Sequence, residues 1–111
     1  MMGPWQDKLS SVVRGLKNLR SVNEPVAEAA HQLDLATRKT GVLDDKTHEL
    51  ISLAVAVTTR CDGCISAHAH AAKKAGASKE EVAAALGTAI ALNAGAATVY
   101  STRVLDAYDQ F

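Results

Sequence analysis

Two cysteines and a histidine are the residues of this 111-residue chain that can do chemistry by type and spacing. Cys61, Cys64 and His68 stand at positions i, i+3 and i+7, which fall along one face of a helix. Neighbours three apart have Cβ atoms roughly 5–6 Å apart, so the two thiols are within reach of a disulfide. Free N–H groups in the first helical turn favour a thiolate, and His68 can accept the proton of Cys64. The spacing therefore predicts a redox-active pair with a nearby base.

Other interpretations of these residues stay open. The cysteines could be inert small hydrophobic residues, or half of a zinc site completed by His68 and by His31 or His48. A structural zinc needs four ligands, and no second Cys-x-x-Cys exists. Ile65 follows the second cysteine where a c-type haem attachment needs histidine. We therefore predict no metal and no cofactor.

Composition restricts the classes of protein. The chain is 48 % hydrophobic and 22 % charged, with 12 basic and 12 acidic residues. This length predicts one domain spanning residues 1–111. The zero net charge argues against nucleic acid and against an anionic membrane surface. No stretch of 18 apolar residues is expected to avoid charge, so we expect no membrane span. Met1 to Lys8 lacks a secretory pattern, so we expect a cytoplasmic protein.

The elements that must position the cysteines are predicted to be helices, and no strand is predicted. Apolar residues recur at helical spacing. Asn23, Asp44 and Ser78 with Glu81 are typical helix caps. We expect Asn93-Ala94-Gly95 to break or kink the last long segment. The third of these helices is apolar nearly all round, which predicts burial on most sides. The prediction is a compact all-α domain of about six helices, over residues 5–20, 23–39, 46–59, 61–75, 79–92 and 96–108.

The pattern Glu49-x11-Cys61-x2-Cys64-x3-His68, followed by Ala75-Gly76-Ala77-Ser78 and the segment from Leu92 to Tyr100, resembles the carboxymuconolactone decarboxylase/AhpD-like superfamily. It is most similar to the AhpD-like alkylhydroperoxidase branch. The resemblance covers roughly residues 35–111. It implies an AhpD-like helical domain that reduces alkyl hydroperoxides or hydrogen peroxide.

The resemblance also implies roles for single residues. Cys64 would be the peroxidatic thiol and Cys61 the resolving one, while Glu49 and His68 would form the proton relay. Without the resemblance, Glu49 reads equally well as a first-turn acid facing the helix dipole. The implied reductant is an external dithiol, possibly on a lipoylated carrier protein. One position departs from the best-known AhpD pattern, since Gly63 stands where that pattern has a histidine.

Association is expected on two grounds. The segment from Ala83 to Ala97 is apolar on nearly every face, and a chain of this size has too little interior to cover it. The resemblance also implies a homo-oligomer, because short members of the family rebuild the missing packing between subunits. The implied assembly is a hexamer built as a trimer of dimers. Two alternatives to a peroxidase remain. One is a thiol–disulfide oxidoreductase or redox sensor using the same pair, and the other is a non-catalytic helical assembly protein.

Overall fold

The computed structural model describes residues 3–111 and confirms the all-α prediction. No strand occurs in these residues. The first two residues of the Met1–Lys8 segment lie outside the described part. Five helices follow one another in the chain: α1 (Pro4–Val22), α2 (Glu24–Ala36), α3 (Asp45–Thr59), α4 (Asp62–Lys74) and α5 (Lys79–Asp109).

The helices begin where the sequence places a cap. The side chain of Asn23 accepts a hydrogen bond from the N–H of Val26 at the start of α2. Asp44 accepts one from the Thr47 N–H at 2.8 Å ahead of α3. Ser78 and Glu81 form a reciprocal capping box at the start of α5. Each cap satisfies N–H groups that have no partner within their own helix.

The expected break at Asn93-Ala94-Gly95 was wrong, since the predicted fifth and sixth helices form one continuous α5 of 31 residues. The Asn93 side chain donates to the Ala89 carbonyl one turn back at 2.7 Å, and to the Thr58 hydroxyl of α3 at 2.9 Å. With its amide engaged, Asn93 offers the backbone no alternative turn. A glycine inside a helix costs only about 1 kcal/mol, which the rest of a long helix tolerates.

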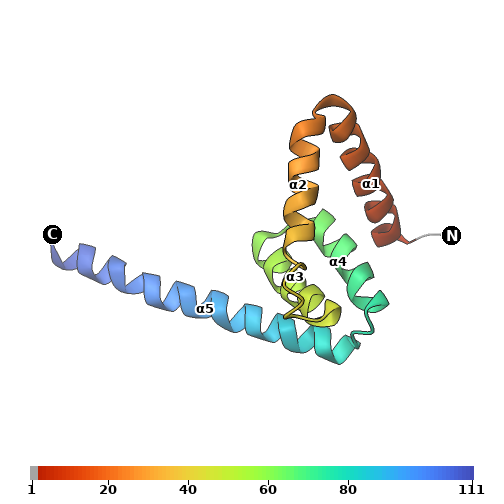
Figure 1. The fold of residues 1–111 in the computed structure, drawn as a ribbon. Coiled ribbons are helices and arrows are strands. Elements are labelled where there is room, and N and C mark those ends of the chain that lie inside the picture. Colours follow the sequence, from red (N-terminus) through yellow and green to blue (C-terminus); the bar gives the residue numbers. More distant parts are fainter. Residues whose placement is uncertain (1–2) are drawn as a thin grey trace.

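Two groups of helices meet at α4 (Figure 1). Helix α3 packs against α4 and α5, while α1 packs against α2 and α4. Among the described helices, α2 packs against α1 alone, so α1 and α2 form a hairpin that meets the rest of the chain along α4. The hydrophobic residues that are fully buried are few and mostly small: Leu53, Ala56, Ala72 and Ala89.

The single chain is open rather than compact, because α5 extends well beyond the other helices (Figure 1). Its radius of gyration is 18.0 Å, against about 13 Å for a compact domain of this length. The expectation that α3 is covered on most sides was wrong for the single chain, where Ile51 and Val55 are 48 % and 56 % exposed. Helix α3 buries one face only, which carries Glu49, Leu53 and Ala56.

One described helix, α5, is long and apolar enough to cross a membrane by length and composition alone. The expectation that charged residues interrupt every apolar stretch of 18 residues was wrong for α5. Thr, Asn, Gly and Ser interrupt residues 82–102, but none of these residues is charged. Core helices of other proteins share this composition, and here almost all of the apolar stretch is exposed.

Candidate functional site

The turn between α3 and α4 sets the position of the first cysteine. Arg60 adopts the left-handed conformation, with φ of 55°, and ends α3. Cys61 then donates its N–H to the Ala56 carbonyl at 3.1 Å and becomes the residue that caps α4. The predicted helix over 61–75 therefore starts one residue later, at Asp62. This turn places Cys61 at the N-terminal end of α4.

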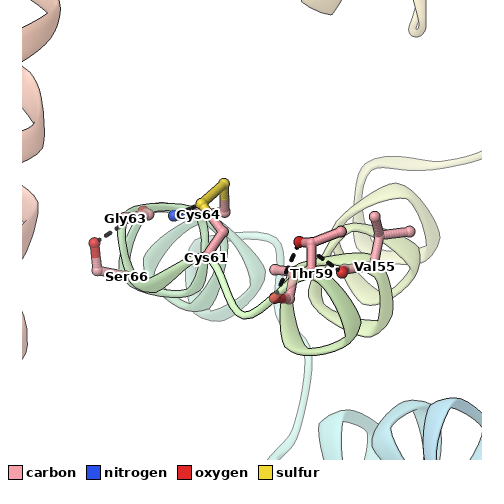
Figure 2. Close-up of a disulfide and its surroundings, with 7 residues drawn as sticks. Val55, Thr59, Cys61, Gly63, Cys64 and Ser66 are labelled. Atoms are coloured by element: carbon pink, nitrogen blue, oxygen red, sulfur yellow. Dashed lines mark hydrogen bonds between the residues drawn. A yellow bond between two sulfur atoms is a disulfide. The ribbon is translucent and has the colours of Figure 1, made fainter. Parts of the chain in front are cut away.

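Cys61 and Cys64 form a disulfide, with their Cα atoms 5.2 Å apart (Figure 2). The bond holds both sulfur atoms on one side of α4, and both residues are half-buried rather than buried. The Cys61 Sγ accepts a hydrogen bond from the Cys64 N–H at 3.1 Å. Of the two sulfur atoms, that of Cys61 is therefore the one that accepts an N–H group of the first turn in the disulfide form.

Helix α1 covers Gly63, the residue directly before the second cysteine. A Cβ added to Gly63 would lie 3.0 Å from Cγ2 of Val12, closer than nearly all real contacts of this kind. Beside it, the buried Ser66 donates its hydroxyl to the Gly63 carbonyl at 3.1 Å (Figure 2). Any side chain at position 63, a histidine included, therefore requires Val12 to give way by a few tenths of an ångström.

Glu49 and His68 meet between α3 and α4. Oε2 of Glu49 lies 2.6 Å from Nδ1 of His68, although 18 residues separate them in sequence. Glu49 is only 3 % exposed, whereas His68 is half-buried. An acid that only faces the helix dipole would be exposed to water. The carboxylate of Glu49 is buried and has a specific partner, His68.

A third charged residue, Arg38, joins the pair. Its Nη2 lies 2.8 Å from Oε1 of Glu49, and its Nη1 lies 3.8 Å from Asp45. Sequence reasoning missed Arg38, which lies in the turn after α2 and belongs to no recognisable motif. A buried carboxylate requires a cation or several donors, so the burial of Glu49 is the signal that calls for such a residue.

The surroundings of Glu49 act on its pKa in opposite directions. Burial raises the pKa, whereas the hydrogen bonds from Arg38 and His68 lower it, and the net effect is a pKa below the ordinary value. Glu49 is therefore a carboxylate at neutral pH. The same contact raises the pKa of Arg38.

The ionised Glu49 fixes the proton of the neutral imidazole. A carboxylate only accepts hydrogen bonds, so Nδ1 of His68 must carry the hydrogen and donate it to Oε2. In the neutral ring this leaves Nε2 as the unprotonated nitrogen. Such a nitrogen can take a proton from a thiol, which is the chemistry that a Cys-x-x-Cys pair needs.

Of the remaining histidines, His70 lies beside the Glu49 site, whereas His31 lies on the hairpin of α1 and α2. His70 lines a cavity of about 540 Å³ together with Arg38, Asp45, Glu49 and Lys74. His31 lines the groove between α1 and α2. Within residues 3–111, no three His, Cys, Asp or Glu side chains gather in a way that could hold a metal ion.

Comparisons with known proteins agree with this geometry. A sequence model of the carboxymuconolactone decarboxylase family matches residues 24–107. The chain therefore belongs to the carboxymuconolactone decarboxylase family, which includes AhpD-like proteins.

Three relatives are similar to this chain in sequence. A Haemophilus influenzae protein described as uncharacterized is 55 % identical over 97 % of this chain and 96 % of its own length. A Paracoccus denitrificans protein, described as uncharacterized protein 4 in cox locus, is 37 % identical over 63 % of each chain. An uncharacterized protein of Cupriavidus necator is 31 % identical over 78 % of this chain and 77 % of its own.

Proposed function

We propose that this protein is a thiol peroxidase that reduces alkyl hydroperoxides or hydrogen peroxide through the Cys61–Cys64 pair. The observation that carries the proposal is the contact between buried Glu49 and His68, one turn of α4 beyond Cys64. Any nucleophilic reaction of a Cys-x-x-Cys pair requires a base that takes the thiol proton. The carboxylate–imidazole pair supplies one where a thiol must lose its proton to react.

The oxidative half of the cycle consumes both thiols. His68 takes the proton of Cys64, and the thiolate attacks one oxygen of the hydroperoxide. The O–O bond breaks, the alkoxide leaves as an alcohol with that proton, and Cys64 becomes a sulfenic acid. The Cys61 thiol then attacks the Cys64 sulfur, water leaves, and the disulfide forms. Two electrons pass from the two thiols to the peroxide.

The reductive half requires an external dithiol. One thiolate of the donor attacks the disulfide and forms a mixed disulfide, and the second thiol of the donor releases the reduced pair as the donor closes its own disulfide. We propose a lipoylated carrier protein as this partner. Because such a cycle requires a reducing compartment, we propose a cytoplasmic location.

The direct test mixes the reduced protein with cumene hydroperoxide in a stopped-flow instrument and counts free thiols. We expect rapid loss of both thiols, with one alcohol formed per disulfide, and no peroxide consumption by Cys64→Ser. Dihydrolipoamide should restore the thiols faster than glutathione does. Slow peroxide loss together with fast oxidation by small disulfides would overturn the proposal and favour a thiol–disulfide oxidoreductase.

We also propose that the protein works as a homo-oligomer, a hexamer built as a trimer of dimers. The chain exposes 8565 Å², whereas a monomer of 11.6 kDa exposes about 5,800 Å². The excess, about 2,700 Å² per chain, is of the size that obligate interfaces bury. A second copy of the same chain would cover the exposed apolar face of α5.

A further inference from the structure

We propose that Arg38 is a positioning residue of the proton relay: it holds one oxygen of Glu49 so that the other stays aimed at Nδ1 of His68. The inference deepens the proposed function and rests on it. Arg38 touches neither the cysteines nor the peroxide in this scheme. It acts through Glu49, and through Glu49 on the ring nitrogen that receives the thiol proton.

The two oxygens of Glu49 are divided between two partners. Oε1 receives Arg38 at 2.8 Å and Oε2 receives His68 at 2.6 Å. The side chain of Glu49 is 4 % exposed and that of Arg38 is 34 % exposed. The guanidinium therefore reaches from the surface to a carboxylate that water hardly touches. Two opposed contacts fix the rotation of the carboxylate, which a single contact to His68 would leave free.

Arg38 is itself held in place. Its N–H donates to the Leu35 carbonyl at 3.1 Å, and its own carbonyl accepts from Gly41 at 3.2 Å. The turn after α2 is thus fixed by backbone hydrogen bonds on both sides of the arginine. Asp45, one turn before Glu49 on α3, restrains the second guanidinium nitrogen at 3.8 Å.

The charged groups around Glu49 come from three parts of the chain. They are Arg38 in the turn after α2, Asp45 on α3, and His68, His70 and Lys74 on α4. On α5, which also packs against α3, Glu81 is neutralised by Lys46 at 2.9 Å. Arg38 and His68 are the groups in hydrogen-bond contact with Glu49, and Arg38 keeps its charge at every pH of interest.

Removing Arg38 changes the relay in a defined direction. Burial then opposes the carboxylate form of Glu49 with only His68 left to support it, so the pKa of Glu49 rises. A protonated Glu49 no longer requires the hydrogen on Nδ1, and Nε2 ceases to be fixed as the base. The thiol should then react normally only at a higher pH than in the parent protein.

The test measures how fast iodoacetamide alkylates Cys64 as a function of pH, in a Cys61→Ser background where Cys64 is the single thiol. We expect Arg38→Gln to move the acidic limb of this profile upward by about one to three pH units. Arg38→Lys, which keeps the charge, should recover part of the shift. Arg20→Gln is the matched control, since Arg20 forms its ion pair with Glu28 on the hairpin surface, and it should leave the profile unchanged.

Two results would overturn the inference. One is an unchanged profile in Arg38→Gln, and the other is a rate lowered by the same factor at every pH, which indicates loss of structure only. If Arg38→Gln fails to fold, Arg38→Lys is measured with and without Glu49→Gln. If Arg38 acts through Glu49, the shift of the alkylation profile that remains in Arg38→Lys must disappear when Glu49→Gln is also present. If Arg38→Gln shows the predicted alkylation shift but the parent protein consumes no peroxide, the role of Arg38 stands and the peroxidase assignment is refuted.

Discussion

At the scale of single residues, the reactivity of Cys64 depends on an imidazole whose proton is placed by a buried carboxylate. Replacing His68 by Asn removes the base but keeps a polar side chain of similar size. We expect reaction with cumene hydroperoxide at pH 7 to slow by about 10²–10⁴-fold, the usual contribution of a positioned base. Stopped-flow rates across pH 5–10 should show the loss shrinking at alkaline pH, where hydroxide deprotonates the thiol. An unchanged pH–rate profile would exclude the relay.

Glu49 also makes the stability of the fold depend on pH. Folding lowers its pKa below the ordinary value of 4.5. Its contribution is therefore present above that value and is lost as the pH falls through the lowered pKa of the folded state. Glu49→Gln should lower the free energy of unfolding at pH 7 by about 1–3 kcal/mol, and this deficit should shrink at pH 3. Urea unfolding at both pH values checks this, with the exposed Glu24→Gln as control; a deficit equal at both would contradict it.

How much of the site could be predicted from sequence depends on how local each contact is. Cys61, Cys64 and His68 lie on one helix, so helical periodicity brings them together without knowledge of the fold. Glu49 entered through the family pattern, and its contact with His68 requires α3 to pack against α4. Arg38 lies in an irregular turn, and no periodicity predicts where the side chains of such a turn point.

At the scale of helices, the packing of α1 on α4 explains the glycine at position 63. Gly63→Ala forces Val12 to move, and we expect it to destabilise the fold by about 1 kcal/mol. In a Val12→Ala background the same change should be neutral or stabilising, because alanine favours a helix over glycine by about 1 kcal/mol. Thermal unfolding of the four proteins measures this coupling. Equal effects of Gly63→Ala in both backgrounds would show that Val12 does not constrain position 63.

Helix ends followed from sequence more reliably than helix continuity. Asn23, Asp44 and Ser78 cap the helices that they were predicted to cap, because capping is a contact within three residues. Inside the continuous α5, the Asn93 amide donates to the Ala89 carbonyl and to Thr58 of α3. The second contact crosses between helices, so the residues near Asn93 in sequence could not reveal it.

At the scale of the whole molecule, the exposed apolar side chains of α5 should lie between copies of the chain. Leu105, 66 % exposed, has few contacts to lose within one chain. Leu105→Glu should therefore reduce the mass measured by light scattering after size exclusion without loss of helical circular dichroism. Gln110→Glu, which adds the same charge beyond the end of α5, should keep the parent mass. A parent protein of 11.6 kDa in solution would contradict the proposed assembly.

The extended shape of the single chain could be predicted from sequence only in part. The apolar composition of the segment from Ala83 to Ala97 predicts that something must cover it. It does not predict that α5 runs straight past the other helices, because that depends on the continuity at Asn93. The same continuity gives α5 the length of a membrane-spanning helix. In the proposed oligomer, the apolar face of α5 lies in the interface between chains.

The central claim, that Cys64 attacks peroxide while Cys61 resolves the product, is tested most directly by trapping the intermediate. Reduced Cys61→Ser protein is treated with one equivalent of cumene hydroperoxide in the presence of dimedone and analysed by peptide mass spectrometry. We predict a nearly stoichiometric dimedone adduct on Cys64, and a disulfide without adduct in the parent protein. An unmodified Cys64, or equally fast labelling of Cys61 in the Cys64→Ser protein, would contradict the account.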